Sequence, residues 1–424
     1  MNQQFVLKGD ICYCTSLQSL ATLRGGYLVC EDGRSVGVYT ELPEKYRHYS
    51  LTDYGNALLL PGLTDLHVHA PQFTFRALGM DLELLDWLNT RTFPEEAKYH
   101  ELAYAERAYS AFVNDVRKGP NTRAVIFATL HVPATMLLME KLEKSGLRSM
   151  VGKVNMDRNS PPVLREESAD TSLRDTCDWL SQAKVGFQHT SPILTPRFIP
   201  SCSDELMYGI SSLQKQTGLP VQSHLSENQS ECGWVQELCP NAKGYADAYR
   251  QYGQFGGDVP TIMAHCVWMK DEEIELMAQN TVYVAHCPQS NMNLSSGIAP
   301  VRRFLDQGVP VGLGSDVAGG CHTSIFRAIS DAVQASKLHW RLQDQEAKPL
   351  SVTEAFFLAT LGGGSFFGKV GSFEAGYDFD VIAVDDAALA SAEPLSIEDR
   401  LARVIYLSDD RHIVGKYVTG EKLF

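Results

Sequence analysis

The 424-residue sequence predicts an α/β fold: a (β/α)8 or TIM barrel joined to a small β-sandwich domain built from both chain termini. Strand-like and helix-like segments alternate through the middle of the chain, which is typical of parallel strands with helical crossovers. Both ends instead carry short apolar runs separated by turn residues. We therefore expect residues 1–58 and 366–424 to form the β domain and residues 59–365 to form the (β/α)8 barrel.

The predicted β domain begins with three clear groups of strands. The sequence there reads "FVLKGDICYC", "GGYLVCEDGRSVGVY" and "GNALLLPG", with apolar runs broken by glycine and aspartate. The same style returns near the other end, in "FDVIAVDD" and "VIYLSDDRHIVGKYVTGEKLF". Because these strands are short and lie at both ends, they are expected to pair with one another beside the barrel.

The barrel region supplies eight candidate strands in order. They are residues 62–69, 122–131, 149–157, 191–198, 219–227, 260–268, 281–289 and 309–316. Helical patterns lie between most of them, such as "DELMYGISSLQKQTG" and "KDEEIELMAQN". Eight strands with helical connections match a barrel of ~250 residues or more.

Composition narrows the function classes. The formal net charge of −14 argues against nucleic acid or an anionic membrane as partner, because both select basic surfaces. The 10 cysteines are scattered without a C-x-x-C pair, the start "MNQQFVLKGD" does not resemble a signal peptide, and no apolar run approaches the ~20 residues of a membrane helix. We expect a soluble, cytoplasmic protein with reduced thiols.

Polar residues follow the apolar part of most candidate strands. In "PGLTDLHVH", His67 and His69 point to the same side because side chains alternate along a strand. An isolated H-x-H is more often a strand end leaving the core. Here, however, other strands end the same way: Arg197, His224, Glu227, His265, His286 and Asp316 stand at their carboxyl ends. These ends meet on one face of a barrel, where active sites lie, so the pattern favours a functional site.

The residue types at these ends indicate metal-assisted hydrolysis. Three imidazoles and one carboxylate are a usual ligand set for zinc, and we assign His67, His69, His224 and Asp316. A water bound to such a metal has a pKa near ~7. Glu227 is placed to carry protons, and His265 to orient the attacking hydroxide. The fourth strand ends in "ILTPRF" without a bridging lysine, so we expect one zinc ion per subunit; iron and manganese stay open.

Several motifs resemble the amidohydrolase superfamily, and most closely its guanine deaminase branch. The superfamily resemblance rests on "PGLTDLHVH", "SHLSE", "AHC" and "GLGSD"; the narrower one rests on "HAPQF", "LLDWLNTRTFP", "TPRF" and "HCPQSNMNLSSG". The resemblance implies hydrolysis of guanine to xanthine and ammonia in purine catabolism, with a metal-bound hydroxide attacking C2. It also implies a homodimer.

The resemblance further implies roles for single residues. Glu227 would protonate the adjacent ring nitrogen, and Asp316 would take the proton of the attacking water and pass it to the leaving amine. The base would be contacted by Gln72, Arg197 and Phe198, next to His69, His224, Glu227 and Asp316. Arg197 can donate to the ring carbonyl, Gln72 offers a donor and an acceptor, and Phe198 offers a face for stacking.

Two rival functions remain open from the sequence. One is another aminohydrolase of the superfamily, acting on cytosine, an adenosine derivative or a chlorinated triazine. The other is a catalytically silent scaffold, which would be expected to have lost metal ligands. Arg197 and Gln72 favour guanine over the first, and the complete ligand set argues against the second.

Four further features have weaker interpretations. "LELLDWL", with Trp87, is predicted to pack as a lid over the site. His131 is predicted to be structural and His286 to support the site, while Cys287 is disfavoured as a nucleophile. "GGGSFFGKV" nearly fits a phosphate-binding loop, but Val370 stands where a Ser or Thr must bind magnesium, so we interpret it as a turn.

Overall fold

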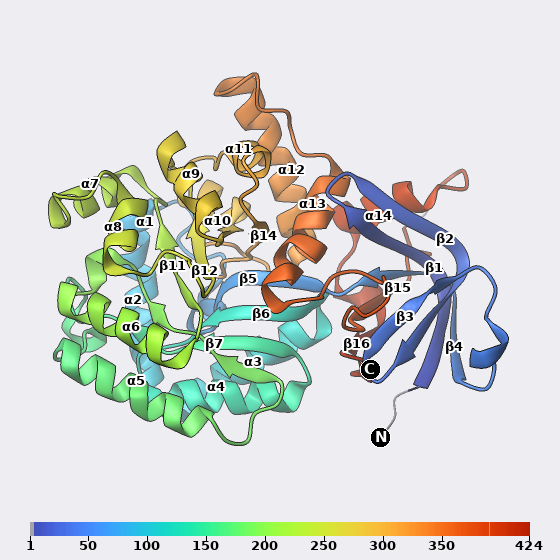
Figure 1. Cartoon of the computed structure of the whole chain (residues 1–424), viewed down its shortest axis with the longest axis horizontal. Helices are drawn as coiled ribbons and strands as arrows, with labels where there is room; N and C mark the ends of the chain where they lie inside the picture. The colour runs from blue at the N-terminus through green and yellow to red at the C-terminus, as the bar shows by residue number, and fades with distance from the viewer. Residues whose placement is uncertain (1–3, 390) are drawn as a thin grey trace.

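The computed structural model describes residues 4–389 and 391–424, and it places an α/β barrel beside a smaller β domain (Figure 1). Strands from both ends of the chain, blue and red in Figure 1, lie side by side in the β domain. The barrel accounts for the remainder, with its helices on the outside. The predicted fold class is therefore confirmed.

Eight principal parallel strands form the wall of the barrel. In order they are β5 (Leu63–His69), β6 (Asn121–Phe127), β7 (Arg148–Gly152), β9 (Thr190–Pro192), β11 (Val221–Leu225), β12 (Thr261–His265), β13 (Val282–His286) and β14 (Val311–Leu313). They form two four-stranded parallel sheets, β5-β6-β7-β9 and β11-β12-β13-β14. The pair β8 (Val154–Asn155) and β10 (Thr195–Pro196) and the bridge from Leu194 to Val221 link the two sheets on one side.

Backbone hydrogen bonds close the barrel on its other side. The Asp316 N–H donates to the His67 carbonyl at 2.8 Å, and the His69 N–H donates to the Val317 carbonyl at 3.2 Å. The segment after β14 is thereby held against β5. Closure brings the last strand's carboxyl end, with Asp316, next to the two histidines of the first strand.

The barrel interior is filled with side chains. Leu66, Val125, Ile262 and Ala285 belong to one buried cluster although they come from four different strands. Side chains from strands on opposite sides of a barrel meet only inside it. The packed interior supports the polar site at the carboxyl ends of the strands.

The helices follow the order expected of crossovers. They are α1 (Leu84–Trp87), α2 (Phe93–Glu96), α3 (Leu102–Lys118), α4 (Val132–Ser145), α5 (Ala169–Ala183), α6 (Asp204–Thr217), α7 (Gln229–Leu238), α8 (Tyr245–Tyr252), α9 (Asp271–Gln279), α10 (Pro288–Asn293), α11 (Val301–Asp306), α12 (Ile325–Leu342), α13 (Val352–Phe357) and α14 (Ile397–Leu407). Helix α6 shows why its boundaries lie where they do. The Ser203 side chain caps its start by accepting the Leu206 N–H, and Gly218 ends it in a left-handed conformation with φ of 68°.

The β domain is one seven-stranded sheet in the order β17-β16-β15-β4-β1-β2-β3. Its strands are β1 (Gln4–Ser16), β2 (Ser19–Glu31), β3 (Arg34–Tyr39), β4 (Ser50–Pro61), β15 (Val381–Val384), β16 (Ile413–Val418) and β17 (Glu421–Lys422). Phe5 of β1 stacks on Tyr417 of β16 with ring centroids 5.5 Å apart, although two strands separate β1 from β16 in the sheet. This contact shows that the sheet is strongly curled. One continuous sheet thus encloses the core that the sequence predicted as a sandwich. The exact division after residues 58 and 365 stays a prediction.

A buried ion pair joins the barrel to the β domain. Arg123 of β6 donates from Nε to Asp380 Oδ2 and from Nη2 to Asp378 Oδ2, both at 2.7 Å. Asp380 precedes β15 and is 1% exposed, so its charge depends on this partner. Replacing Arg123 with Ala is expected to destabilise the fold by ~3–5 kcal/mol, since it strands a buried carboxylate.

Thermal unfolding checks this stability prediction. The matched control is Lys8→Ala, which breaks an exposed pair with Asp53 at 3.1 Å and should change the unfolding temperature little, because water screens the pair. An Arg123→Ala protein that unfolds at the same temperature as Lys8→Ala would show that the pair does not stabilise the junction.

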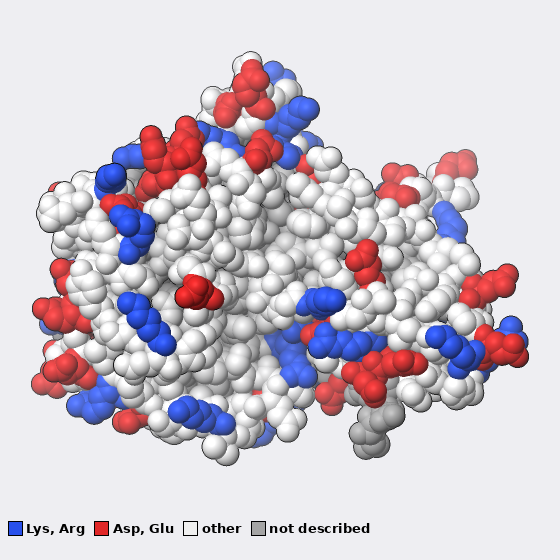
Figure 2. Space-filling view, in the orientation of Figure 1, with Lys and Arg blue, Asp and Glu red and all other residues white. Residues whose placement is uncertain are grey.

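On the face shown in Figure 2, acidic and basic groups are interspersed, and large uncharged areas lie between them. Within residues 4–389 and 391–424, no helix has both the length and the apolar character needed to cross a bilayer.

Candidate active site

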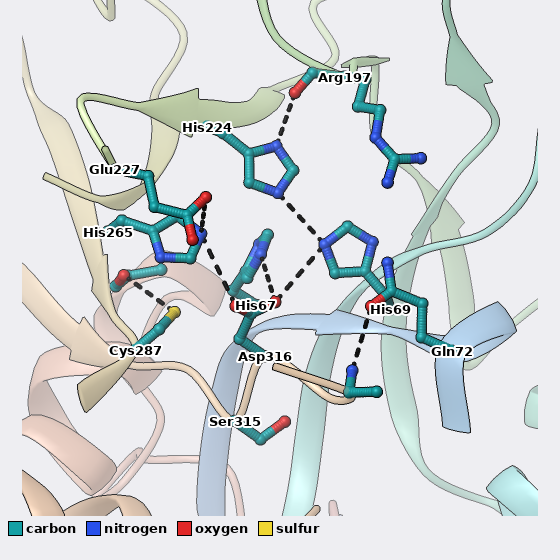
Figure 3. A network of polar contacts seen from close by, with 12 residues as sticks. His67, His69, Gln72, Arg197, His224, Glu227, His265, Cys287, Ser315 and Asp316 are labelled. Carbon is teal, nitrogen blue, oxygen red and sulfur yellow. Dashed lines mark hydrogen bonds and ion pairs between the residues drawn. The ribbon is translucent and has the colours of Figure 1, made fainter. Parts of the chain in front are cut away.

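The polar residues predicted from the strand ends converge at one end of the barrel (Figure 3). His67 and His69 lie on β5, His224 on β11 and His265 on β12, while Asp316 follows β14. All but His224, which is half-buried, are at least 94% buried. His265 and Asp316 have positive φ angles of 72° and 44°, a conformation that non-glycine residues rarely adopt and that often marks functional sites.

Donor atoms of the four predicted metal ligands face one another. His69 Nε2 lies 3.2 Å from His224 Nε2. Asp316 Oδ1 lies 3.2 Å from His67 Nε2 and 3.6 Å from His69 Nε2. His224 donates from Nδ1 to the Arg197 carbonyl at 2.6 Å, which leaves its Nε2 with a lone pair directed at the other ligands.

This donor set fits a divalent cation. Burial lowers the pKa of His67 and holds the pKa values of His69 and His224 well below the ordinary value, so the rings are neutral ligands. Among the described residues, His67 Nδ1 has no hydrogen-bond partner, and His67 Nε2 faces Asp316 Oδ1 at 3.2 Å. Inward-facing lone pairs on buried neutral rings repel one another unless a cation lies between them. Three imidazoles and a carboxylate are a ligand set that zinc accepts.

The carboxylate of Asp316 supplies negative charge to this site. Burial disfavours ionisation of Asp316, but the neighbouring imidazoles, His67 first, outweigh burial and lower the pKa of the carboxyl group. An ionised Asp316 next to neutral histidines is the protonation state that a metal ligand set requires.

Cys287 also lies near the ligands but differs from them chemically. One potential ligand atom each from His67, Cys287 and Asp316 lie within 4.8 Å of one another. Burial raises the pKa of the Cys287 thiol well above its ordinary value, and the thiol donates to the Ala285 carbonyl at 3.3 Å. A protonated, buried thiol is a poor metal ligand and a poor nucleophile, which agrees with the expectation that Cys287 is not the nucleophile.

Glu227 and His265 lie beside the ligand set. His265 Nε2 is 3.4 Å from Glu227 Oε2 and 3.7 Å from Asp316 Oδ2. Burial, together with the nearby carboxylates of Asp316 and Glu231, raises the pKa of Glu227 well above its ordinary value. This shift favours the protonated form of Glu227, which a general acid requires.

A cavity of about 510 Å³, including its open mouth, lies above these groups. Its lower wall includes His69, His224, Glu227, His265 and Asp316. Apolar side chains of the segment after β5 form much of the remaining wall: Leu84, Leu85, Trp87 and Leu88. A mostly apolar pocket of this size with a few polar groups is typical of small-molecule sites. The prediction that "LELLDWL" packs over the site agrees with this arrangement.

The three predicted base-contacting residues line the same cavity. Gln72, Arg197 and Phe198 face it from the segments after β5 and β10. Gln72 accepts the Ala318 N–H at Oε1, at 3.1 Å, and donates from Nε2 to Glu96 at 2.8 Å. Arg197 donates from both terminal nitrogens to Glu96.

Three residues that sequence analysis did not single out orient the site. Asn291 Oδ1 accepts from His265 Nδ1 at 2.9 Å, which directs Nε2 toward Glu227. Asp65 accepts the backbone N–H groups of His67, at 3.1 Å, and Ser315, at 3.0 Å. Glu96 binds Arg197 and Gln72. Asn291 lies in the motif "HCPQSNMN" and Asp65 in "PGLTDLHVH". Their presence in these motifs was the sequence signal for a role at the site, although sequence analysis assigned them none.

The remaining histidines of interest lie outside the pocket. His131 lines a separate hollow together with His100, and burial lowers its pKa to about 4. His286 is buried at the end of β13, and burial lowers its pKa to about 3. Neither lines the cavity above Asp316. Both rings are therefore neutral; a structural role for His131 and a supporting role for His286 stay predictions.

Comparisons with known proteins agree with this site. The model of the amidohydrolase family matches residues 58–423. The guanine deaminase of Dictyostelium discoideum is 38% identical over 382 residues, covering 88% of this chain and 84% of that protein. The guanine deaminase of Homo sapiens is 36% identical over 378 residues, covering 86% and 82%.

A solved structure extends the match to the whole fold. The crystal structure of guanine deaminase from C. acetobutylicum, with guanine bound in its active site, is 44% identical in sequence. It superposes with a TM-score of 0.96 and covers 99% of this chain and 100% of its own. The chain therefore belongs to the amidohydrolase family and, within it, to the guanine deaminases.

Proposed function

We propose that this chain hydrolyses guanine to xanthine and ammonia, with His67, His69, His224 and Asp316 holding one metal ion. The observation that carries this proposal is the convergence of four neutral or anionic donors, the carboxyl group of Glu227 and a buried arginine on one apolar-walled cavity. The guanine deaminases at 36–38% identity support the substrate.

Each polar group of the site has a chemical task in this reaction. A divalent cation held by the four ligands would supply Lewis acidity that lowers the pKa of a water molecule. Asp316 accepts the proton of the attacking water and passes it to the leaving amine. Glu227, whose raised pKa favours the protonated form, donates its proton to the ring nitrogen next to C2, and it regains one from the C2 hydroxyl as the amine leaves. His265, whose Nδ1 donates to Asn291, forms a hydrogen bond with the attacking oxygen through Nε2 and fixes its direction.

Recognition of the base follows from the groups around the cavity. Arg197 donates to the C6 carbonyl of guanine, a group that adenine lacks. Gln72 presents a donor and an acceptor to the purine edge. Phe198 stacks on the ring. A site built from such hydrogen bonds rejects an analogue that cannot make them by ~10⁴-fold or more.

Replacing Arg197 with Ala is expected to raise KM for guanine by ~10–100-fold, because a charged hydrogen bond to the carbonyl is lost. The change in kcat should be smaller, since the carbonyl is bound alike in the ground and transition states. Steady-state kinetics with guanine check this. An Arg197→Ala enzyme with the wild-type KM would remove Arg197 from the base-binding pocket.

A panel of purines and pyrimidines tests the function itself. Ultraviolet spectra recorded with the purified protein should show guanine converting to xanthine, with cytosine and adenine compounds unchanged. Consumption of cytosine or an adenine compound with guanine untouched would favour another aminohydrolase. If the purified protein contains no metal and shows no turnover after zinc is added, the result would favour a catalytically silent scaffold.

Three finer points belong to the same proposal. Zinc is the metal we propose, because its common ligand sets include three histidines and a carboxylate; iron binds similar donors. The protein is proposed to form a homodimer, as the family resemblance implies. A cytoplasmic location is supported by the ten cysteines, all of which are free thiols.

A further inference from the structure

Glu96 connects the wall of the cavity to two of the residues that are proposed to bind the base, Arg197 and Gln72. It ends α2 in the segment that we call the roof, residues 84–96, which also supplies Leu84, Leu85, Trp87 and Leu88 to the cavity. The Glu96 side chain is buried and turns toward Arg197. Its Oε2 accepts from Arg197 Nη1 at 2.5 Å, and its Oε1 accepts from Arg197 Nη2 at 3.1 Å.

A second contact ties Glu96 to the other base-binding residue. Oε1 of Glu96 also accepts from Gln72 Nε2 at 2.8 Å. Because the Ala318 N–H donates to Gln72 Oε1, the amide of Gln72 is held at both ends and cannot flip without losing both bonds. Glu96 thus determines which edge of the Gln72 amide faces the cavity.

The charge of the substrate explains why the pocket needs this carboxylate. Arg197 is 5% exposed, and a buried guanidinium without an anion is strongly disfavoured. Guanine is neutral and cannot provide the counter-charge. Glu96 provides it, and two of the five N–H groups of Arg197 are used in doing so, which leaves three for the cavity and its surroundings.

A second residue of the roof, Phe93, lies against the guanidinium group of Arg197. The Phe93 ring centroid lies 5.4 Å from Arg197 Cζ, a distance typical of a cation–π contact. Phe93 begins α2 and Glu96 ends it. One short helix therefore sets both the plane and the direction of the arginine.

We propose that Glu96 is the positioning residue that makes the site selective for a 6-oxo purine, by orienting Arg197 and Gln72 together and by coupling them to the roof. The inference rests on the proposed function, because it assigns Arg197 to the C6 oxygen. Glu96 itself does not touch the reacting atoms.

The test compares guanine with 2-aminopurine, which carries the C2 amine but no C6 oxygen. Glu96→Gln should raise KM for guanine by ~10–100-fold with little change in kcat, since a displaced arginine weakens binding of the base. The inhibition or Michaelis constant of 2-aminopurine should change by less than ~3-fold, because this base has no C6 oxygen for Arg197 to bind. The ratio of the two constants is the readout.

The neighbouring Glu95 provides a matched control. Glu95 lies on the same helix and is similarly buried, but its carboxylate bonds Thr74 at 2.7 Å and Lys98 at 2.5 Å. Glu95→Gln should therefore leave the guanine to 2-aminopurine ratio unchanged. An equal rise in this ratio for both variants would assign Glu96 a merely structural role and overturn the proposal.

A double-mutant cycle separates this inference from the proposed function. If Glu96 acts through Arg197, Glu96→Gln should add less than ~3-fold to the guanine constant in an Arg197→Ala background. Fully additive effects would contradict the proposal. Dissociation constants for guanine and 2-aminopurine give the same cycle without turnover. A wild-type protein that forms no xanthine would refute the proposed function, while the binding cycle would still decide the role of Glu96.

Discussion

Replacing Glu227 with Gln is expected to lower kcat for guanine by ~10²–10⁴-fold while the metal content stays at the wild-type level. The glutamine has the same shape and can still hydrogen-bond Ser296, which lies 3.3 Å from Glu227 Oε1. It has no transferable proton. Burial and two neighbouring carboxylates raise the pKa of Glu227, which favours the protonated form of the wild-type side chain.

Metal analysis and steady-state kinetics on the same Glu227→Gln preparation check this prediction. The matched control is Glu237→Gln on the exposed side of α7, which should behave as wild type. Turnover within ~3-fold of wild type in Glu227→Gln would show that another group carries the proton. Loss of the metal together with activity would indicate that Glu227 is a ligand.

Replacing Asp316 with Asn is expected to abolish detectable xanthine formation and to weaken metal binding by more than ~100-fold. Substitution of groups that only support ligands already costs ~10–100-fold, so loss of a direct ligand should cost more. The Asp316 carboxylate faces His67 and His69 with Oδ1 and His265 with Oδ2. The amide lacks the negative charge that balances the cation and cannot accept the proton of the attacking water.

Competition with a chelator of known affinity measures this loss. Asp306→Asn, at an exposed carboxylate on α11, is the control and should retain both metal and activity. An Asp316→Asn enzyme that binds metal as tightly as wild type would exclude Asp316 from the ligand set.

The sequence predicted the parts of the site that follow from strand periodicity. His67, His69, His224 and His265 were found because a parallel barrel brings strand ends to one face, and the structure places them together. Asp316 was found in the same way, although its position beside His67 depends on two closing backbone hydrogen bonds.

The sequence could not predict contacts made by loops and short helices. Glu96 and Arg197 are separated by 101 positions, and nothing in the local pattern distinguishes Glu96 from Glu95, which turns toward Thr74 instead. The sequence also did not predict the curl of the seven-stranded sheet in the β domain, because the contact between Phe5 and Tyr417 depends on twist that accumulates over several strands. Long-range packing, rather than propensity, decides such details.

The most direct test of the central claim is to measure metal content and guanine-to-xanthine turnover on the same samples as the metal is removed and restored. The account predicts one equivalent of metal per chain at full activity, loss of turnover in proportion to the metal removed, and recovery when zinc is added back. Metal-free protein that forms xanthine at the full wild-type rate would contradict it.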